Sequence, residues 1–218
     1  MIKAITSLRS ATVLKAARGF GVALALNLAG CSILPQPVAD PTRYYLLGTP
    51  ARSEAAVSAP KGTLHVGLRG LELPPYLRNN RTMVVRSGAN EIRYEDYARW
   101  AEPLDQAVQR VIRDRLLARD AVASAEIAPY SPQIRRDIDV VVRVLQCEGG
   151  QEGAGRKTVQ FSANYEILDQ RKDGAVVLRK NFTAPAADWD GNDFGRLASL
   201  LGAAAAALGD DIAANLPN

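Results

Sequence analysis

Residues 159–167 carry the feature that most restricts the fold of this chain, a strict alternation of apolar and polar side chains. Successive side chains of a β-strand point to opposite faces, so the pattern predicts a strand with one buried face. Residues 176–183 follow across Asp173-Gly174, a pair typical of tight turns between antiparallel strands. Residues 138–145 form another apolar run just before. The three segments predict consecutive hairpins, with one face of the sheet free to contact water.

Two helices are predicted to cover the apolar face of this sheet. The first begins at Pro103, because proline is tolerated in the first helical turn. The second begins near Asn192, where Asp188, Asp190 and Asn192 are candidate N-caps. Both place apolar residues at three- and four-residue steps: Leu104, Val108, Val111, Ile112 and Leu116 in the first, and Phe194, Leu197, Leu201, Leu208 and Ile212 in the second. Small residues on the second, such as Gly202, would let it pack closely against the sheet.

Shorter strands are predicted at residues 44–47, 64–68 and 122–127, and a hairpin from residues 81–86 and 91–94. The sequence therefore predicts an α+β fold over residues 44–218. We expect a single domain with a mostly antiparallel or mixed sheet and two helices packed on one face.

Residues 1–30 have the pattern of a cleaved leader. Four basic residues and no acids come first, residues 20–28 are apolar, and Leu-Ala-Gly-Cys ends at Cys31. The apolar run is about half the roughly 20 residues that a membrane-spanning helix needs. The last four residues resemble the bacterial lipobox, and an ordinary signal or membrane anchor is the alternative. The resemblance implies cleavage before Cys31, which would then carry a diacylglycerol and an acyl chain such as palmitate. Residues 31–43 are proline-rich and are predicted to form an extended tether.

Charge and cysteine content exclude some classes of protein. The formal charge of the chain is +4, and all of it is accounted for by the leader, so the remainder is neutral. No basic cluster with interleaved aromatic residues suggests nucleic-acid binding. If Cys31 carries lipid, Cys147 has no intrachain partner and is expected to be a buried thiol.

Catalytic and metal-binding motifs are not indicated. His65 is the sole histidine, so a histidine-rich metal site is excluded. Residues 150–158 have the glycines of a phosphate-binding loop, but Arg156 interrupts the motif and a strand follows where a helix is required. Residues 188–193 begin like a calcium loop but lack its glycine at the sixth position. We expect no catalytic residue, metal or cofactor apart from the lipid on Cys31, although carboxylates from distant segments could still meet in a tethered enzyme.

Three segments taken in order resemble the ABC-type transport auxiliary lipoprotein family, of the PqiC/YmbA type. They are Leu-Glu-Leu-Pro-Pro-Tyr-Leu-Arg at 71–78, Met-Val-Val-Arg at 83–86 and Tyr-Ala-Arg-Trp-Ala-Glu-Pro-Leu at 97–104. Tyr-Tyr-Leu-Leu at 44–47 also fits. The resemblance implies a lipoprotein of the outer membrane that faces the periplasm. It further implies an ABC transporter with an MCE-domain protein as partner, phospholipid or another hydrophobic molecule as cargo, and a homo-oligomeric ring in some members. Ser32, in place of the aspartate that retains lipoproteins at the inner membrane, agrees with this location.

The expected function is that of a non-enzymatic docking component of such a transport system. A membrane-anchored lipid carrier, with its ligand between sheet and helices, is the alternative. Tyrosine, tryptophan and arginine dominate interface energetics, so we predict partner contacts from six residues: Leu73, Tyr76, Leu77, Tyr97, Arg99 and Trp100. In the competing interpretation Trp100 packs the first helix onto the sheet, and Pro74-Pro75 is only a rigid turn.

Overall fold

Three long strands pair consecutively in the computed structural model, which describes residues 38–48, 62–78, 81–131, 133, 135–151 and 155–217. They are β6 (Ile138–Gln151), β7 (Lys157–Asp169) and β8 (Ala175–Thr183), paired antiparallel in that order. In β7 the odd-numbered side chains from Val159 to Ile167 are buried, as the alternation predicted. The leader, Cys31 and most of the tether lie outside the described residues.

The sheet is mixed, which confirms one of the two predicted forms. Along the edge of β6 opposite β7, β2 (Leu64–Leu68) pairs parallel near one end and β3 (Thr82–Arg86) pairs parallel near the other. Outside β2 lies β5 (Val122–Ile127), again parallel. Outside β3 lies antiparallel β4 (Ile92–Trp100), followed by parallel β1 (Arg43–Tyr45). The short β9 (Ala187–Asp188) pairs with β7. β6 therefore connects three groups of strands, because it pairs with β2, β3 and β7.

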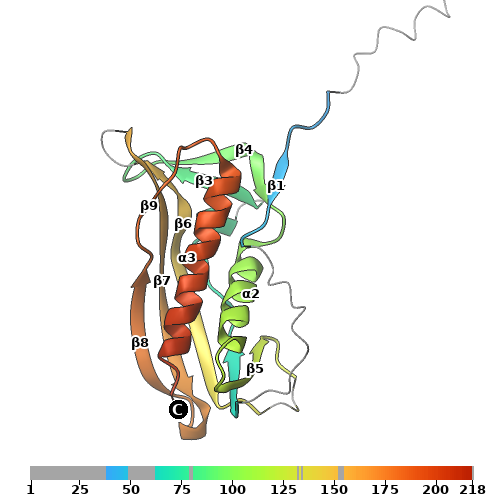
Figure 1. The fold of residues 1–218 in the computed structure, drawn as a ribbon, viewed down its shortest axis with the longest axis vertical. Coiled ribbons are helices and arrows are strands. Elements are labelled where there is room, and N and C mark those ends of the chain that lie inside the picture. Colours follow the sequence, from blue (N-terminus) through green and yellow to red (C-terminus); the bar gives the residue numbers. More distant parts are fainter. Residues whose placement is uncertain are drawn as a thin grey trace, which may run out of the picture. The chain divides into compact units, whose positions relative to one another are not determined.

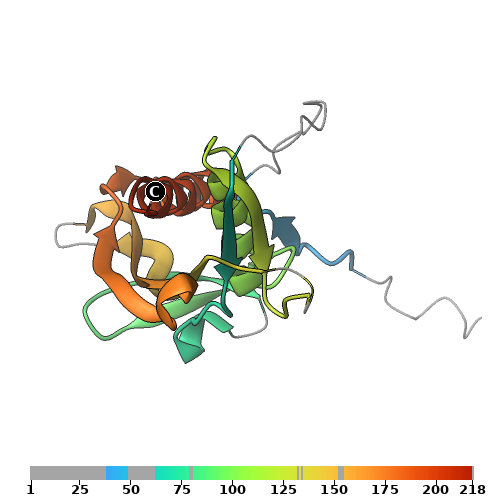
Figure 2. The same ribbon diagram turned by 90° about the horizontal axis from the view of Figure 1, so that it is seen from below.

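Two helices cover one face of this sheet, α2 (Leu104–Leu117) and α3 (Phe194–Ala214). They lie side by side, α3 against β7 and α2 against β5 (Figure 1). In the view along the helices, β7 and β8 stand on one side of α3, and β2 and β5 stand on the other (Figure 2). The predicted stripes are buried except for Val111 and Phe194, which are partly buried. The α+β fold predicted for this part of the chain is thus confirmed.

The start of α3 differs in detail from the prediction. Asp193, and none of the three predicted residues, caps the helix by accepting a hydrogen bond from the Arg196 backbone N–H at 2.9 Å. Asp190 accepts from the backbone N–H groups of Asn192 and Asp193 instead, both at 2.8 Å. These bonds lower the pKa of Asp190 and shape the turn that leads into α3.

Polar contacts and a close backbone approach hold α3 in place. Asp211 accepts hydrogen bonds from the Tyr165 hydroxyl of β7 at 2.8 Å and from Lys180 Nζ of β8 at 2.7 Å. Gly202 lies so near residue 48 that a Cβ on it would be 2.6 Å from the Gly48 nitrogen. By length and composition α3 could cross a membrane, and it is the one such helix in the described part of the chain. Its apolar stripe is nevertheless packed in the core.

Candidate functional site

A groove of about 540 Å³ runs between α2, α3 and the segment that follows β1. Small residues of α3 make up much of its wall, among them Ala198, Gly202 and Ala206, and Val111 lines it from α2. Tyr45 and Leu46 line it from the β1 side. The groove forms because side chains this small leave space beside α3. Its volume lies within the range of small-molecule sites.

The charged residues at this groove are already paired. Arg110 donates to Glu102 at 2.5 Å and to the Leu47 carbonyl at 3.3 Å. Arg115 donates to both carboxylate oxygens of Asp210, at 2.6 and 2.9 Å, which raises the pKa of its guanidinium. The guanidinium groups on this side are therefore engaged by the protein itself. What the groove offers a ligand is chiefly apolar surface.

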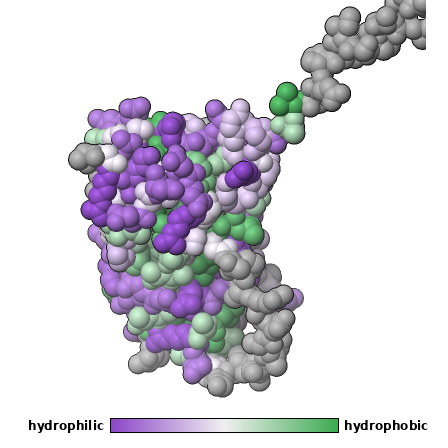
Figure 3. Space-filling model, turned by 45° about the horizontal axis from the view of Figure 1, so that its top comes forward, coloured by the Kyte–Doolittle hydropathy of each residue, from purple (hydrophilic) through white to green (hydrophobic). Residues whose placement is uncertain are grey.

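Figure 3 shows a mostly hydrophilic end of the molecule towards the viewer, with hydrophobic patches farther down.

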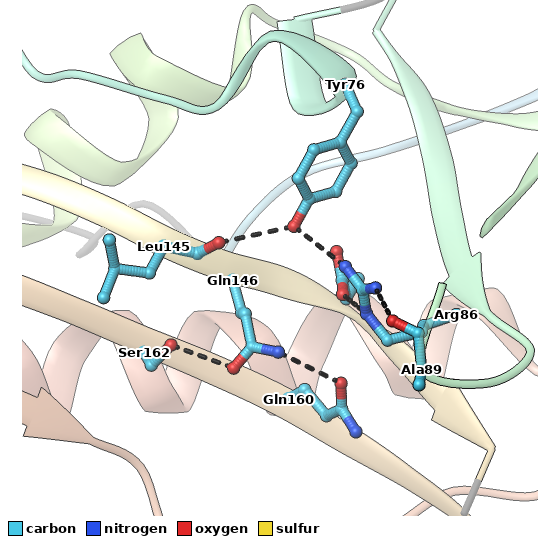
Figure 4. A network of polar contacts seen from close by, with 8 residues as sticks. Tyr76, Arg86, Ala89, Leu145, Gln146, Gln160 and Ser162 are labelled. Atoms are coloured by element: carbon cyan, nitrogen blue, oxygen red, sulfur yellow. Dashed lines mark hydrogen bonds and ion pairs between the residues drawn. The ribbon is translucent and has the colours of Figure 1, made fainter. Parts of the chain in front are cut away.

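On the opposite face of the sheet, Tyr76 and Arg86 (Figure 4) form a polar network with Glu148. Arg86 Nε donates to Oε1 of the fully buried Glu148 at 2.5 Å, and its guanidinium lies 5.7 Å from the centre of the Tyr76 ring. The Tyr76 hydroxyl donates to the Leu145 carbonyl at 3.3 Å and accepts from Arg86 Nη2 at 3.5 Å. Burial, and then the neighbouring Glu148, raise the pKa of Tyr76. The network attaches η2 (Pro75–Arg78), a 3₁₀-helix, to β6 and β3.

The six predicted partner contacts occupy different environments. Leu73, Leu77 and Trp100 are buried in the core, so the expectation that they lie on the surface is wrong. Leu77 belongs to η2, which contacts β3, so Leu73 and Leu77 face the core although Pro75 between them is exposed. Trp100 fits the competing interpretation, because it ends β4 just before α2 and is 3 % exposed.

Tyr76 is half-buried in its network, whereas Tyr97 and Arg99 remain accessible on β4. Tyr97 is 60 % exposed and Arg99 is partly exposed. Tyr44 of β1 lies opposite Arg99 in the parallel register. Sequence reasoning did not select Tyr44 as a contact, although it stands beside Tyr45 in the segment used for the family resemblance. The groove also escaped prediction, since its walls come from distant segments.

The residues considered as catalytic groups or metal ligands have structural roles. His65 Nδ1 lies 2.8 Å from the Ser124 hydroxyl of the adjacent strand, and its backbone N–H donates to Asp137. Cys147 is buried, which raises the pKa of its thiol. Among the described residues, no group of three or more histidine, cysteine, aspartate or glutamate side chains is placed to hold a metal ion.

Comparison with known proteins decides the family. A model described as the ABC-type transport auxiliary lipoprotein component matches residues 45–213. The chain belongs to this family. The match includes all three segments of the predicted resemblance, together with both helices. The auxiliary lipoproteins are components of ABC-type transport, and this coarse role now applies to the chain.

Solved structures agree with the fold. A crystal structure of a Xanthomonas campestris protein, assigned to the family DUF330, is similar with a TM-score of 0.61 and 17 % identity. The similarity covers 79 % of this chain and 89 % of that one. A second crystal structure, of an uncharacterised protein, gives a TM-score of 0.61 and 16 % identity, covering 81 % and 99 %. At such identities the likeness concerns the fold of the auxiliary lipoprotein alone. No curated protein matches the chain.

Proposed function

We propose that this auxiliary lipoprotein is anchored through lipid on Cys31 to the periplasmic face of the outer membrane. There it serves as the docking component for the MCE-domain protein of an ABC transporter that moves phospholipid or another hydrophobic molecule. It catalyses no reaction in this proposal. The observation that carries it is the family match over residues 45–213. The lipobox-like sequence that ends at Cys31 supports the lipid anchor, and Ser32 after it supports the outer membrane as the location.

A crosslinked pull-down of the full chain from cell envelopes tests this function. Mass spectrometry should recover an MCE-domain protein with the chain, and the size of the crosslinked species reports whether the chain forms a homo-oligomeric ring. The control is an exposed variant far from β1, Val177→Ser on β8, which should recover the same partner. Recovery of the chain with no transporter component would contradict the docking role.

A lipid carrier is a second candidate function, because the α2–α3 groove offers apolar surface and sufficient volume. Ala203 lines the groove from α3 and is exposed, so Ala203→Phe would fill space without entering the core. Ala214→Phe, at the exposed end of the same helix, is the matched control. A carrier should copurify with lipid, and Ala203→Phe alone should reduce the amount. Absence of bound lipid from the parent chain would reject the carrier function.

A further inference from the structure

The exposed large apolar side chains of the unit formed by residues 41–218 are unevenly distributed. Eight are exposed among the residues that the structure describes there, and half of these belong to β1, β4 or the residue just after β1: Tyr44, Leu46, Tyr94 and Tyr97. The other four are Leu117, Leu145, Val176 and Val177. Isolated exposed apolar residues are normal on a protein surface, whereas a group of them marks an interaction site.

Strand pairing brings two of these tyrosines together. Residues that pair across two strands, and residues two apart on one strand, point to the same face of a sheet. Tyr44 pairs with Arg99, and Tyr97 lies two residues before Arg99, so the three side chains share a face. Ala98 and Trp100 point to the other face and are buried. Tyr44, Tyr97 and Arg99 are called the tyrosine surface below.

The fold does not account for the exposure of these tyrosines. Each is 60 % exposed, whereas Tyr45, which follows Tyr44 on β1, packs partly against the core. A hollow of about 240 Å³ adjoins Tyr97, and Arg43, Tyr45 and Phe194 also line it. The face thus combines aromatic rings, hydroxyl groups and an adjacent recess, all accessible to an external partner.

The sequence connects this surface directly to the predicted anchor. Tyr44 follows Cys31 by thirteen residues, and a segment of that length spans at most about 45 Å when fully extended. β1 is the first strand after Cys31 in the described chain. A lipid on Cys31 would therefore hold the tyrosine surface within reach of the bilayer. Tyrosine is enriched where membrane meets water, because its ring is apolar and its hydroxyl is polar.

We infer that the tyrosine surface rests on the headgroup layer of the membrane that holds the lipid on Cys31. This inference depends on the proposed anchor. It assigns Tyr97 and Arg99 to the membrane, whereas the sequence predicted that they contact a protein partner. Glu95 is ion-paired with Arg93 at 2.7 Å, so Arg43 and Arg99 are left with Asp96 among the charged residues of β1 and β4, a net charge of only one. Binding should therefore depend on the aromatic rings and only weakly on anionic lipid.

The first test is independent of acylation. Full-length Cys31→Ala chain is mixed with phosphatidylethanolamine vesicles, with and without phosphatidylglycerol, and vesicle-bound protein is measured by flotation. Replacing both Tyr44 and Tyr97 by serine should weaken binding about tenfold, since burial of apolar surface sets interfacial affinity. Val176→Ser with Val177→Ser, exposed on β8, is the matched control and should leave binding unchanged. The leader contributes equally to every variant. Equal binding by both double variants would overturn the inference, as would a tyrosine-dependent difference that appears only with phosphatidylglycerol, since the basic leader attracts anionic lipid in every variant.

The second test uses the acylated chain on vesicles. A fluorophore on Arg99→Cys, within the tyrosine surface on β4, is compared with one on Val177→Cys, using lipids with a headgroup quencher. Quenching should be several-fold stronger at position 99, and the two serine substitutions should remove the difference. If position 99 is not quenched but is shielded by an added MCE-domain protein, the surface binds protein and the membrane inference fails. Mass spectrometry of the N-terminal peptide measures acylation separately. A chain that is not acylated would therefore contradict the proposed anchor, and this result is distinct from failure of the tyrosine surface to bind the membrane.

Discussion

Trp100 and Tyr97 lie three residues apart on β4 and have opposite surroundings. Trp100 is buried in the core, whereas Tyr97 is exposed to solvent on the tyrosine surface. Both belong to the segment that resembles the family, so sequence resemblance alone did not separate a packing residue from a surface residue. Burial now separates them, and stability measurements can verify it.

Trp100→Ala is expected to lower the free energy of unfolding by about 3–5 kcal/mol, the usual cost of truncating a buried aromatic side chain. Tyr97→Ala should change it by less than about 0.5 kcal/mol, because the side chain is largely exposed. Urea unfolding of the two variants gives both values. Similar small losses would mean that Trp100 is not a core residue.

The Arg86–Glu148 pair can be examined in the same way. Because Glu148 is fully buried, Arg86→Met would leave a carboxylate without its cation, at a cost of about 3–5 kcal/mol. Adding Glu148→Met should recover much of that loss, since the charge is then gone as well. Thermal or urea unfolding of both single variants and the double variant measures the coupling. Strictly additive losses would show that the two side chains do not interact.

Stability should also fall in alkaline solution. Burial is the main cause that raises the pKa of Tyr76 and of Tyr165. A phenol with a raised pKa binds its proton more tightly in the folded chain than in the unfolded one. Its contribution is complete below pH of about 10, the ordinary tyrosine pKa, and is lost as pH rises above it. The melting temperature should therefore drop above that pH, and less steeply in Tyr76→Phe. A profile unchanged by Tyr76→Phe would contradict this assignment.

At the scale of elements, the junction between α3 and residue 48 depends on a glycine. Alanine normally stabilises a helix by about 1 kcal/mol relative to glycine. In Gly202→Ala, however, the new Cβ would meet the Gly48 backbone at 2.6 Å, and backbone cannot move aside as a side chain can. We expect Gly202→Ala to lower the melting temperature.

Gly195→Ala is the control on the same helix, because its Cβ would meet only side-chain atoms, the nearest being the capping oxygen of Asp193 at 3.2 Å, which can shift by a few tenths of an ångström. This variant should lower the melting temperature much less than Gly202→Ala in the same thermal unfolding experiment. A stabilised Gly202→Ala chain would show that the two segments are not in close contact.

Individual elements were predictable because their signals are local. The bounds of β2 and β5 coincide with the predicted 64–68 and 122–127, and β7 follows its alternation. Partners distant in the sequence were not predictable, since apolar periodicity does not say which strands meet. The parallel pairing of β2 and β3 with β6 is of this kind, and so is that of β1 with β4.

The candidate sites were less accessible to sequence reasoning for the same reason. Leu73 and Leu77 flank two prolines and were expected on an exposed loop, but η2 folds against β3 and buries them. Tyr97 was selected because tyrosine, tryptophan and arginine dominate interface energetics, and it is exposed, but its role as a contact stays a prediction. Its neighbour Tyr44 depends on the β1–β4 register, which no local pattern encodes.

For the whole molecule, attachment to the membrane and folding should be separable. Cys31 precedes the unit formed by residues 41–218. Cys31→Ala is therefore expected to abolish acylation and retention in the outer membrane while leaving the melting temperature unchanged. Membrane fractionation, mass spectrometry of the N-terminal peptide and thermal unfolding measure the three properties. Continued fractionation with the outer membrane would refute the lipobox interpretation.

The position of β6 also determines when the molecule can fold. β2 and β3 are synthesised early. Both pair with β6, and β6 is complete only when the ribosome has reached Gln151. Until about two-thirds of the chain has been made, its early strands lack a central partner, and pairings this distant form slowly. A chain with a leader of the predicted kind would thus still be unfolded while it is threaded across the inner membrane, and would acquire its sheet only on the far side.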